Sequence, residues 1–308
     1  MSAVSTRISA LLALLVGAAC TPTATQSASP SATQTPTQTP LDVAPASGDA
    51  AGFRFELTAT AGIGGVPERI VVEGDVVTLV HAEAAAEGQP IGVFRAALGA
   101  GDRTRIEGAV PDVAAPGPPI APDTPSLHVV LSSKGRHVDR RIGLPSVSPA
   151  VTAILDVAHR LEVLALGSPY RAFRLEVAAP PSPPLAGRPV SLRVGLVNAG
   201  TEPLTLTFAA GAPHLEAAPP PPPPTPGFTP LPVVWTRISA DLGGGPFTLP
   251  PGGRVDVDAI ATLPEPGQRA VWARFDGQVT LRGAGPEEVR FRGLCVARPI
   301  LVMVAARP

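Results

Sequence analysis

The sequence predicts an α+β domain followed by an all-β sandwich, after a signal peptide and a disordered linker. Three observations predict this order. Short runs of alternating apolar and polar residues, bounded by glycine and proline, recur from about residue 53 onward. One segment between those runs, Val151 to Leu164, has helical spacing instead. The first fifty residues contain neither pattern after a short apolar stretch.

The composition is that of a folded protein. The chain has 308 residues, of which 44% are hydrophobic and 16% are charged. That apolar content is enough for a core, and the charge is too low for a disordered polyelectrolyte. The net charge of −1 and the pI of about 6.5 argue against a nucleic-acid binder, which needs a basic surplus.

The N-terminal residues are arranged as a secretory signal. Arg7 precedes the apolar stretch Ile8 to Val16, and the small residues Gly17, Ala18 and Ala19 stand before Cys20. The apolar stretch is too short to span a bilayer as a mature helix. An ordinary signal peptide that happens to be followed by a cysteine is the alternative interpretation.

Ala18, Ala19 and Cys20 resemble the lipobox of bacterial lipoproteins, although leucine is usual where Gly17 stands and Val16 lies one place early. The resemblance implies cleavage after residue 19, a lipid such as palmitate on Cys20, and a membrane anchor in the cell envelope. Thr21, in place of an aspartate, implies the outer membrane if the host is Gram-negative.

Residues 20–50 are expected to form a tether. They are rich in Thr, Pro, Ser, Gln and Ala, and such a segment cannot bury enough apolar surface to fold. As a flexible coil it would reach roughly 30 Å. It would hold the folded part clear of the membrane surface.

Residues 51–168 are expected to form the α+β domain. Gly74-Asp75 suits a hairpin turn, and Ser132 to Gly135 suits a second one. Asp102 is expected to cap a short helix that reaches Val110. The expected strands are Phe53 to Leu57, Arg69 to Glu73, Val76 to His81, Val93 to Leu98, Leu127 to Leu131 and Arg136 to Ile142.

A longer helix should close this domain. Ser148 can cap it, Pro149 suits its first position, and Gly167 can end it. The apolar residues from Val151 to Leu164 recur on one face, so the helix should pack across the strands.

The strand before residue 61, the turn at Glu73-Gly74-Asp75 and the late hairpin leading to the helix resemble the emfourin-like family of metalloprotease inhibitors. The glycine motif of that family is shuffled here. The resemblance implies that Gly62, Ile63, Gly64 and Gly65 contact a protease. The alternative is that these glycines only make a tight bend.

Residues 169–308 are expected to form a β-sandwich of immunoglobulin-like type without a disulfide. Phe208, Trp235, Leu249 and Trp272 are expected in its core. The expected strands are Tyr170 to Val177, Val190 to Val197, Leu204 to Phe208, Val233 to Ile238, Arg254 to Ala261, Ala270 to Phe275, Val279 to Leu281, Val289 to Val296 and Ile300 to Val304.

Val190 to Phe208, Val234 to Arg237 and Phe247 to Gly253 resemble the BsuPI-like family of proteinase inhibitors, which are immunoglobulin-like sandwiches. Two of the family's features are missing, namely the acidic residue near His214 and the late Gly-x-Tyr. The resemblance implies a second inhibitor-like domain, but fold transfers more safely than function.

The prolines from Pro219 to Pro232 are expected to form a polyproline II insertion between strands. The insertion could be a rigid docking segment. A solvated loop is the favoured interpretation, because no second specificity feature accompanies the prolines.

Motifs for catalysis are missing from the sequence. None of the five histidines has metal-site spacing, and there is neither a Walker A motif nor a Gly-x-Ser-x-Gly elbow. No cofactor and no metal are therefore expected. Cys295 lies in an apolar run and is expected to be a buried, inert thiol.

The sequence therefore predicts a non-catalytic binding module anchored in the envelope, with protease inhibition as its sharpest form. The expected partners are a membrane, through the N-terminal lipid, and an extracytoplasmic protease, but no nucleic acid. The alternative is a structural or adhesive cell-surface lipoprotein with an immunoglobulin-like domain. An enzyme of unrecognised type ranks last.

Overall fold

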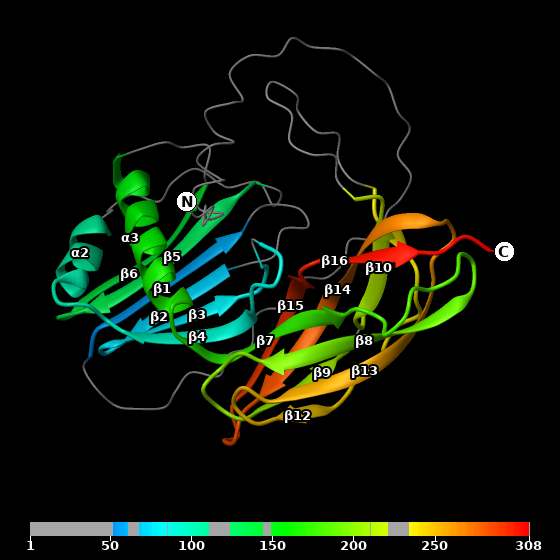
Figure 1. Cartoon of the computed structure of the whole chain (residues 1–308). Helices are drawn as coiled ribbons and strands as arrows, with labels where there is room; N and C mark the ends of the chain where they lie inside the picture. The colour runs from blue at the N-terminus through cyan, green and yellow to red at the C-terminus, as the bar shows by residue number, and fades with distance from the viewer. Residues whose placement is uncertain are drawn as a thin grey trace, which may run out of the picture.

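The computed structural model describes residues 52–60, 68–84, 86–110, 124–143, 149–209, 211–220 and 234–307. These residues form two antiparallel sheets and two helices (Figure 1). The chain is therefore mostly β and built from antiparallel sheets, and the predicted fold is confirmed at this coarser level.

The longer sheet has nine strands and extends through both halves of the chain. Its order is β13-β8-β7-β4-β3-β2-β1-β5-β6, and all neighbours are antiparallel. Its strands are β1 (Arg54–Thr60), β2 (Glu68–Glu73), β3 (Val76–His81), β4 (Ile91–Ala97), β5 (Ser126–Ser133), β6 (Arg136–Gly143), β7 (Pro169–Ala178), β8 (Pro189–Asn198) and β13 (Arg254–Thr262).

The second sheet has seven strands and is organised around β14, which pairs with four others. They are β9, β10, β15 and β16. Its strands are β9 (Leu204–Phe208), β10 (His214–Ala218), β11 (Thr236–Arg237), β12 (Phe247–Leu249), β14 (Gly267–Arg282), β15 (Glu288–Val296) and β16 (Ile300–Val304).

Both predicted hairpins of the first half are present. β2 and β3 pair from Arg69↔Val80 to Glu73↔Val76 around Gly74, whose φ is +58°. β5 and β6 pair along their whole lengths around the turn at Lys134 and Gly135. Glycine at these turns adopts a positive φ without the clash of a β-carbon.

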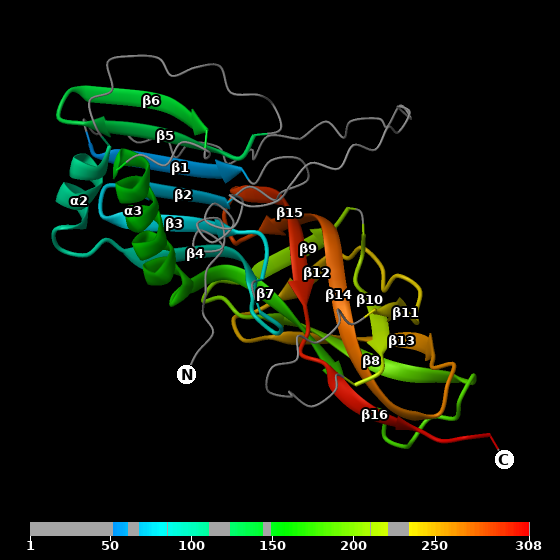
Figure 2. The same cartoon turned by 90° about the horizontal axis from the view of Figure 1, so that it is seen from above.

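Helices α2 (Asp102–Ala109) and α3 (Pro149–Leu166) cover one face of the longer sheet (Figure 2). The predicted apolar stripe of α3 is buried there, together with Phe55, Leu57, Val72, Leu79 and Leu131 from the strands. Of the predicted stripe, Val151, Ile154, Leu155, Ala158 and Leu161 are buried, and Leu164 is partly buried against the same core. Its 3.6-residue spacing therefore gave the correct helix and the correct face.

Asp102 does not cap α2 as predicted. Gly101 is the N-cap residue, and Asp102 occupies the first helical position. The buried Asp102 carboxylate accepts the Gly99 N–H at 3.1 Å and pairs with Arg160 Nε at 2.6 Å, so it ties α2 to α3. The cap predicted for α3, Ser148, lies outside the described residues.

The second sheet packs face to face on the β7-β8-β13 end of the longer sheet. Phe173 from the longer sheet and Phe208 and Phe275 from the second sheet meet in the shared core, with the centroids of Phe208 and Phe275 4.6 Å apart. Aliphatic residues from both sheets surround these rings. Side chains that alternate into a shared layer are what hold two sheets together.

Four details of the second half differ from the prediction. The runs Ala270 to Phe275 and Val279 to Leu281 belong to one strand, β14, because Asp276 to Gln278 continue its pairing with β15. β10 and β12 were not predicted, and only Thr236–Arg237 of the run Val233 to Ile238 is a strand. Phe208, Leu249 and Trp272 are buried as predicted, although Trp272 lies outside the cluster that the two sheets share, and Trp235 is only partly buried.

Glu56, on the face of β1 opposite the helices, makes stability depend on pH. Burial acts to raise the pKa of Glu56, but hydrogen bonds and charges of Arg69 and Arg54 outweigh it and hold this pKa below 4.5. A lowered pKa in the folded state contributes stability that is present above 4.5 and lost as pH falls through the lowered value.

We therefore expect the free energy of unfolding to fall as the solution is acidified below pH 4.5, and to fall less steeply in Glu56→Gln. Urea unfolding across this range measures the difference. Glu265→Gln, at an exposed carboxylate that pairs with Arg269, is the matched control. Equal slopes in the wild type and in Glu56→Gln would contradict the assignment.

Candidate functional site

The residues predicted to act directly on partners lie outside the described residues. They are Cys20, expected to carry lipid, and Gly62, Ile63, Gly64 and Gly65, expected to contact a protease. The structure does describe the strands that hold the ends of the 61–67 connection. These strand ends, Thr60 and Glu68, are the base of the candidate site.

The 61–67 connection joins two central strands of the longer sheet. β1 ends at Thr60 and β2 begins at Glu68, and the two strands pair as Ala59↔Glu68. On the other side β1 pairs with β5, with Thr60 opposite Ser126. Because β1 is paired on both sides, the positions of Thr60 and Glu68 are determined by the sheet and not by the connection between them.

The neighbouring connection, between β3 and β4, is hydrogen-bonded to the second sheet. Ala84 N–H donates to Leu294 O at 3.0 Å, and Leu294 N–H donates to Ala82 O at 2.8 Å. Gly88 N–H donates to Val296 O at 2.7 Å. Since β2 and β3 are antiparallel, this connection is at the same end of the sheet as residues 61–67. The strand ends that hold residues 61–67 are therefore at the end of the sheet where the two halves are joined.

A charged cluster fastens the junction from β4, β7 and the turn before β15. Glu287 accepts hydrogen bonds from Arg171 Nη1 at 3.2 Å and from Arg95 Nη2 at 3.4 Å. The guanidinium carbons of Arg95 and Arg171 lie 4.2 Å and 5.0 Å from the centroid of the Tyr170 ring. Arg171 is buried against Gly283, where a β-carbon would come within 2.2 Å of its Nε.

These contacts connect residues that are far apart in the sequence, since Arg171 and Glu287 are separated by 116 positions. A partly buried ion pair that also has cation–π contacts is stronger than an exposed pair. The cluster was not predicted, because the sequence around Arg171 contains no sign that Glu287 will be its partner. The cluster links β4 and β7 of the longer sheet to the turn before β15 of the second sheet.

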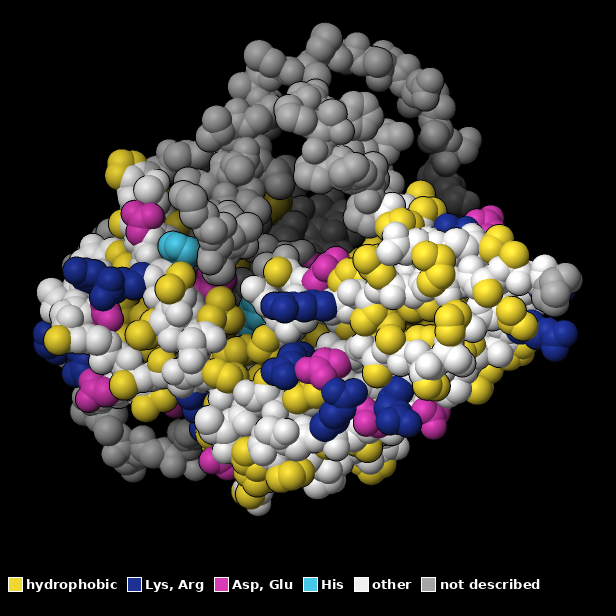
Figure 3. All heavy atoms as spheres, viewed as in Figure 1, with side chains coloured by type: hydrophobic (Ala, Val, Ile, Leu, Met, Phe, Trp, Pro, Cys, Tyr) yellow, Lys and Arg dark blue, Asp and Glu magenta, His cyan; other side chains and the backbone are white. Residues whose placement is uncertain are grey.

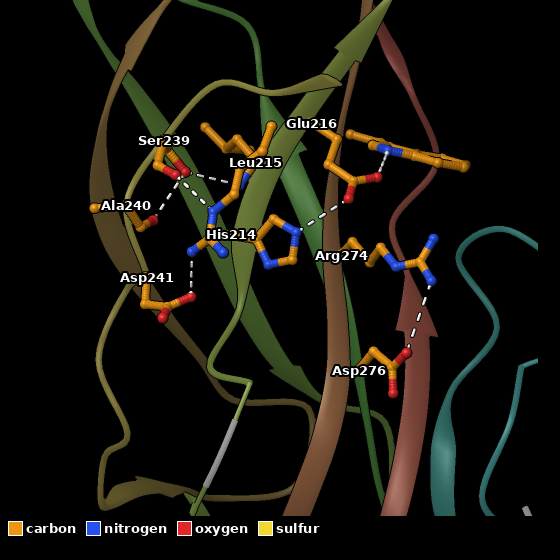
Figure 4. A network of polar contacts seen from close by, with 10 residues as sticks. His214, Leu215, Glu216, Ser239, Ala240, Asp241, Arg274 and Asp276 are labelled. Carbon is orange, nitrogen blue, oxygen red and sulfur yellow. Dashed lines mark hydrogen bonds and ion pairs between the residues drawn. The ribbon is translucent and has the colours of Figure 1, made fainter. Parts of the chain in front are cut away.

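A second polar network lies on the outer face of the second sheet, away from the shared core. Glu216 on β10 accepts from Trp272 Nε1 on β14 at 3.0 Å and lies 3.1 Å from His214 Nε2 (Figure 4). The ring of Trp235 stacks on Trp272 with centroids 3.6 Å apart. Both carboxylate oxygens of Glu216 are thus engaged in positioning neighbouring side chains.

The same network fixes residues 235–241 against β10. Leu215 N–H donates to Ser239 Oγ at 2.8 Å, and Ser239 Oγ donates to Ala240 O at 2.9 Å (Figure 4). Arg237 Nη2 pairs with Asp241 at 2.5 Å. The chain is therefore held in place directly after the 221–233 stretch, which contains most of the predicted proline-rich insertion and lies outside the described residues.

The stacked indoles provide a spectroscopic test of this network, because the chain has only two tryptophans. We expect Trp235→Phe to remove the coupled near-ultraviolet circular dichroism signal of the pair and to cost about 0.5–1.5 kcal/mol of stability. Tyr170→Phe, whose ring contacts Arg95 and Arg171 and not the indoles, should leave the coupled signal in place. A signal unchanged in Trp235→Phe would show that the rings do not stack.

The histidines of the β5–β6 hairpin do not form a joint site. His128 Nε2 lies 2.9 Å from Asp139, and His137 Nδ1 lies 3.0 Å from Ser132 Oγ, so each has its own partner. Among the described residues there is no group of three or more His, Cys, Asp or Glu side chains that could hold a metal ion. Cys295 is buried as predicted, and burial raises the pKa of its thiol to about 12.

Within the described ranges no helix is both long and apolar enough to cross a membrane. No family model matches the chain, and no curated protein matches it.

Two solved structures show weak likeness. The ASH/PapD-like domain 7 of human CEP192 has 13% identity and a TM-score of 0.20, covering 41% of this chain and 85% of that domain. Red sea bream transglutaminase has 12% identity and a TM-score of 0.21, covering 83% of this chain and 27% of the transglutaminase. Scores of this size establish neither a shared fold nor a shared function.

Proposed function

We propose that this chain is an exported, lipid-anchored binding protein that performs no chemistry of its own and acts as a protease inhibitor. In this proposal residues 1–19 are a signal peptide, Cys20 carries the lipid, and residues 20–50 are a tether. Residues 51–168 form the α+β part, and residues 169–308 form an immunoglobulin-like sandwich. The signal-like N-terminus and the two inhibitor-family resemblances support it.

The observation that carries the proposal is the fixed base of the 61–67 connection. A loop inhibits best when its bound conformation already exists, because little entropy is then lost on binding. β1, which leads into this connection, is paired with β2 on one side and with β5 on the other. The adjacent β3–β4 connection is hydrogen-bonded to β15. A protease contacting residues 62–65 would therefore meet a loop whose ends are already positioned.

Inhibition assays with the purified mature chain test this proposal against thermolysin-like and serine proteases. Ile63→Asp should weaken inhibition at least about tenfold, because it places a charge in the expected contact. Lys134→Ala, at an exposed turn at the other end of the sheet, is the matched control and should inhibit like the wild type. If neither thermolysin-like nor serine proteases are inhibited, the proposal is overturned. Recovery of a non-protease envelope partner would then favour the structural or adhesive role.

The anchor is tested separately. Mass spectrometry of the mature chain should show an N-terminal Cys20 carrying acyl chains, and Cys20→Ser should release the protein from the membrane fraction. An intact Met1 or an unmodified Cys20 would contradict export by this route, whatever the inhibition assay shows.

A further inference from the structure

The edge of β16 has backbone groups without a strand partner among the described residues. On one side β16 pairs with β14, from Gly267↔Val304 to Val271↔Ile300. On the other side only Ala305, directly after the strand, is bonded: its N–H donates to Pro184 O at 2.8 Å, and its C=O accepts from Ala186 N–H at 2.9 Å. Backbone groups alternate along a strand, so those of Leu301 and Met303 face the same open side.

The side chains of this edge are apolar and exposed. Leu301 and Met303 are each 59% exposed on the outer face, while Val302 and Val304 between and after them are buried. Leu185 lies beside the strand end at Ala305 and is 38% exposed. Figure 3 shows hydrophobic side chains gathered over the part of the surface where Figure 1 places β16.

The other long edges of the two sheets carry charges, and β16 carries none. The outer face beside edge strand β13 has a ladder of paired charges, visible in Figure 3 as adjacent blue and magenta side chains. At the opposite edge, β6 contains three arginines and an aspartate. Charged side chains on an edge prevent edge-to-edge association. The sequence Ile300–Val304 lacks this protection and has the composition of a pairing strand.

We propose that β16 pairs with β16 of a second copy of this chain, antiparallel and about a two-fold axis at Val302. In this register Leu301 of one copy lies opposite Met303 of the other, and their side chains cover one another on the outer face. The strand is self-complementary because it has no charge to repel its copy. This inference does not depend on the proposed inhibitor function.

The proposed pairing of β16 with its copy has defined ends. Pro299 has no N–H to donate, and the far side of Ala305 is already occupied by residues 184–186. Pairing is therefore confined to Ile300–Val304, which allows about four backbone hydrogen bonds between copies. An interface of this size gives a dimer that dissociates on dilution, so it must be sought as a concentration-dependent equilibrium.

Sedimentation of the full chain in detergent, over concentrations from about 1 µM to about 1 mM, tests the proposal. We expect a monomer–dimer equilibrium that Leu301→Lys and Met303→Lys each weaken about tenfold or more. Ile260→Lys is the matched control, because Ile260 is a 64% exposed aliphatic residue on the β13 edge. It should dimerise like the wild type. Circular dichroism of all variants confirms that they fold.

Disulfide trapping tests the register. Residues directly opposite in such a pair have Cα atoms about 5.5 Å apart, within reach of a disulfide, and the diagonal distance is too long. With a mild oxidant, the double variant Leu301→Cys/Met303→Cys should give a covalent dimer, and Leu301→Cys alone should behave like the wild type.

Three results would overturn the proposal. One is a wild-type chain that stays monomeric throughout, and another is a dimer that survives both lysine variants. The third is vesicle binding by Cys20→Ser that Leu301→Lys abolishes while no dimer forms, which would assign this edge to a lipid surface.

Discussion

Gly92→Ala should be among the most damaging single substitutions in the chain, with an expected loss of about 3 kcal/mol or more. Gly92 has a φ of +139°, and a β-carbon there would lie 2.3 Å from Arg171 O and 2.8 Å from Ala172 Cα. These atoms belong to β7, the strand that continues the longer sheet from the first half into the second. The methyl group would force β4 and β7 apart.

Thermal unfolding measures this loss, which corresponds to a fall in Tm of roughly 6–12 °C for a chain of this size. Gly74→Ala is the matched control. Gly74 also has a positive φ, +58°, but a β-carbon there would meet no atom within 4 Å. Gly74→Ala should therefore lose only about 1–2 kcal/mol of stability, through backbone strain. If the two variants are equally stable, β4 and β7 do not approach as closely as described.

Asn198→Asp should cost about 3–5 kcal/mol, although it changes only one side-chain amide to a carboxylate. The Asn198 Nδ2 lies within hydrogen-bond distance of Glu202 O, Leu249 O and Pro250 O, at 2.8, 3.2 and 3.1 Å. Its Oδ1 accepts the Gly200 N–H at 2.9 Å, and the residue is 1% exposed. A carboxylate there loses every donor and faces three carbonyl oxygens.

The pH dependence of this variant distinguishes the mechanism from simple misfolding. Protonation of the introduced carboxylate restores one hydrogen-bond donor. The stability lost relative to the wild type should therefore become smaller as pH falls toward about 4. Denaturant unfolding at several pH values measures it. The reverse exchange at an exposed position, Asp139→Asn, should stay within about 0.5 kcal/mol of the wild type. A loss in Asn198→Asp that does not vary with pH would contradict this account.

Local features of the fold could be predicted from the sequence, and long-range ones could not. Gly74-Asp75 between two apolar runs predicted the β2–β3 hairpin, because turn chemistry is local. The 3.6-residue spacing after Pro149 likewise predicted α3. β10 was missed because His214–Ala218 combines alanine and glutamate with a short length, and its pairing with β14 has no local sign.

The tryptophans show why burial is harder to predict than secondary structure. Trp235 and Trp272 were placed in the core because large aromatic side chains usually are. In the structure the two rings stack on each other on the outer face of the second sheet, where Trp272 donates to Glu216 and is buried, while Trp235 stays partly exposed. The pairing depends on the register of β10 and β14, which the sequence does not reveal.

The surroundings of the candidate site could not be predicted from the sequence. The glycines at 62–65 mark the connection after β1, but they do not indicate that β1 is paired on both sides or that the neighbouring β3–β4 connection is bonded to the second sheet. The Arg171–Glu287 pair and the bonds from Ala84 to β15 depend on the whole chain having folded.

The strand order also determines when the chain can finish folding during synthesis. β1 to β6 can pair among themselves as they emerge, but β4 remains an open apolar edge until β7 follows it. β8 in turn waits for β13, more than fifty residues later. Pairings this distant in sequence form slowly. A nascent or truncated chain that stops near residue 168 therefore exposes Ile91–Ala97, and such intermediates are prone to aggregation.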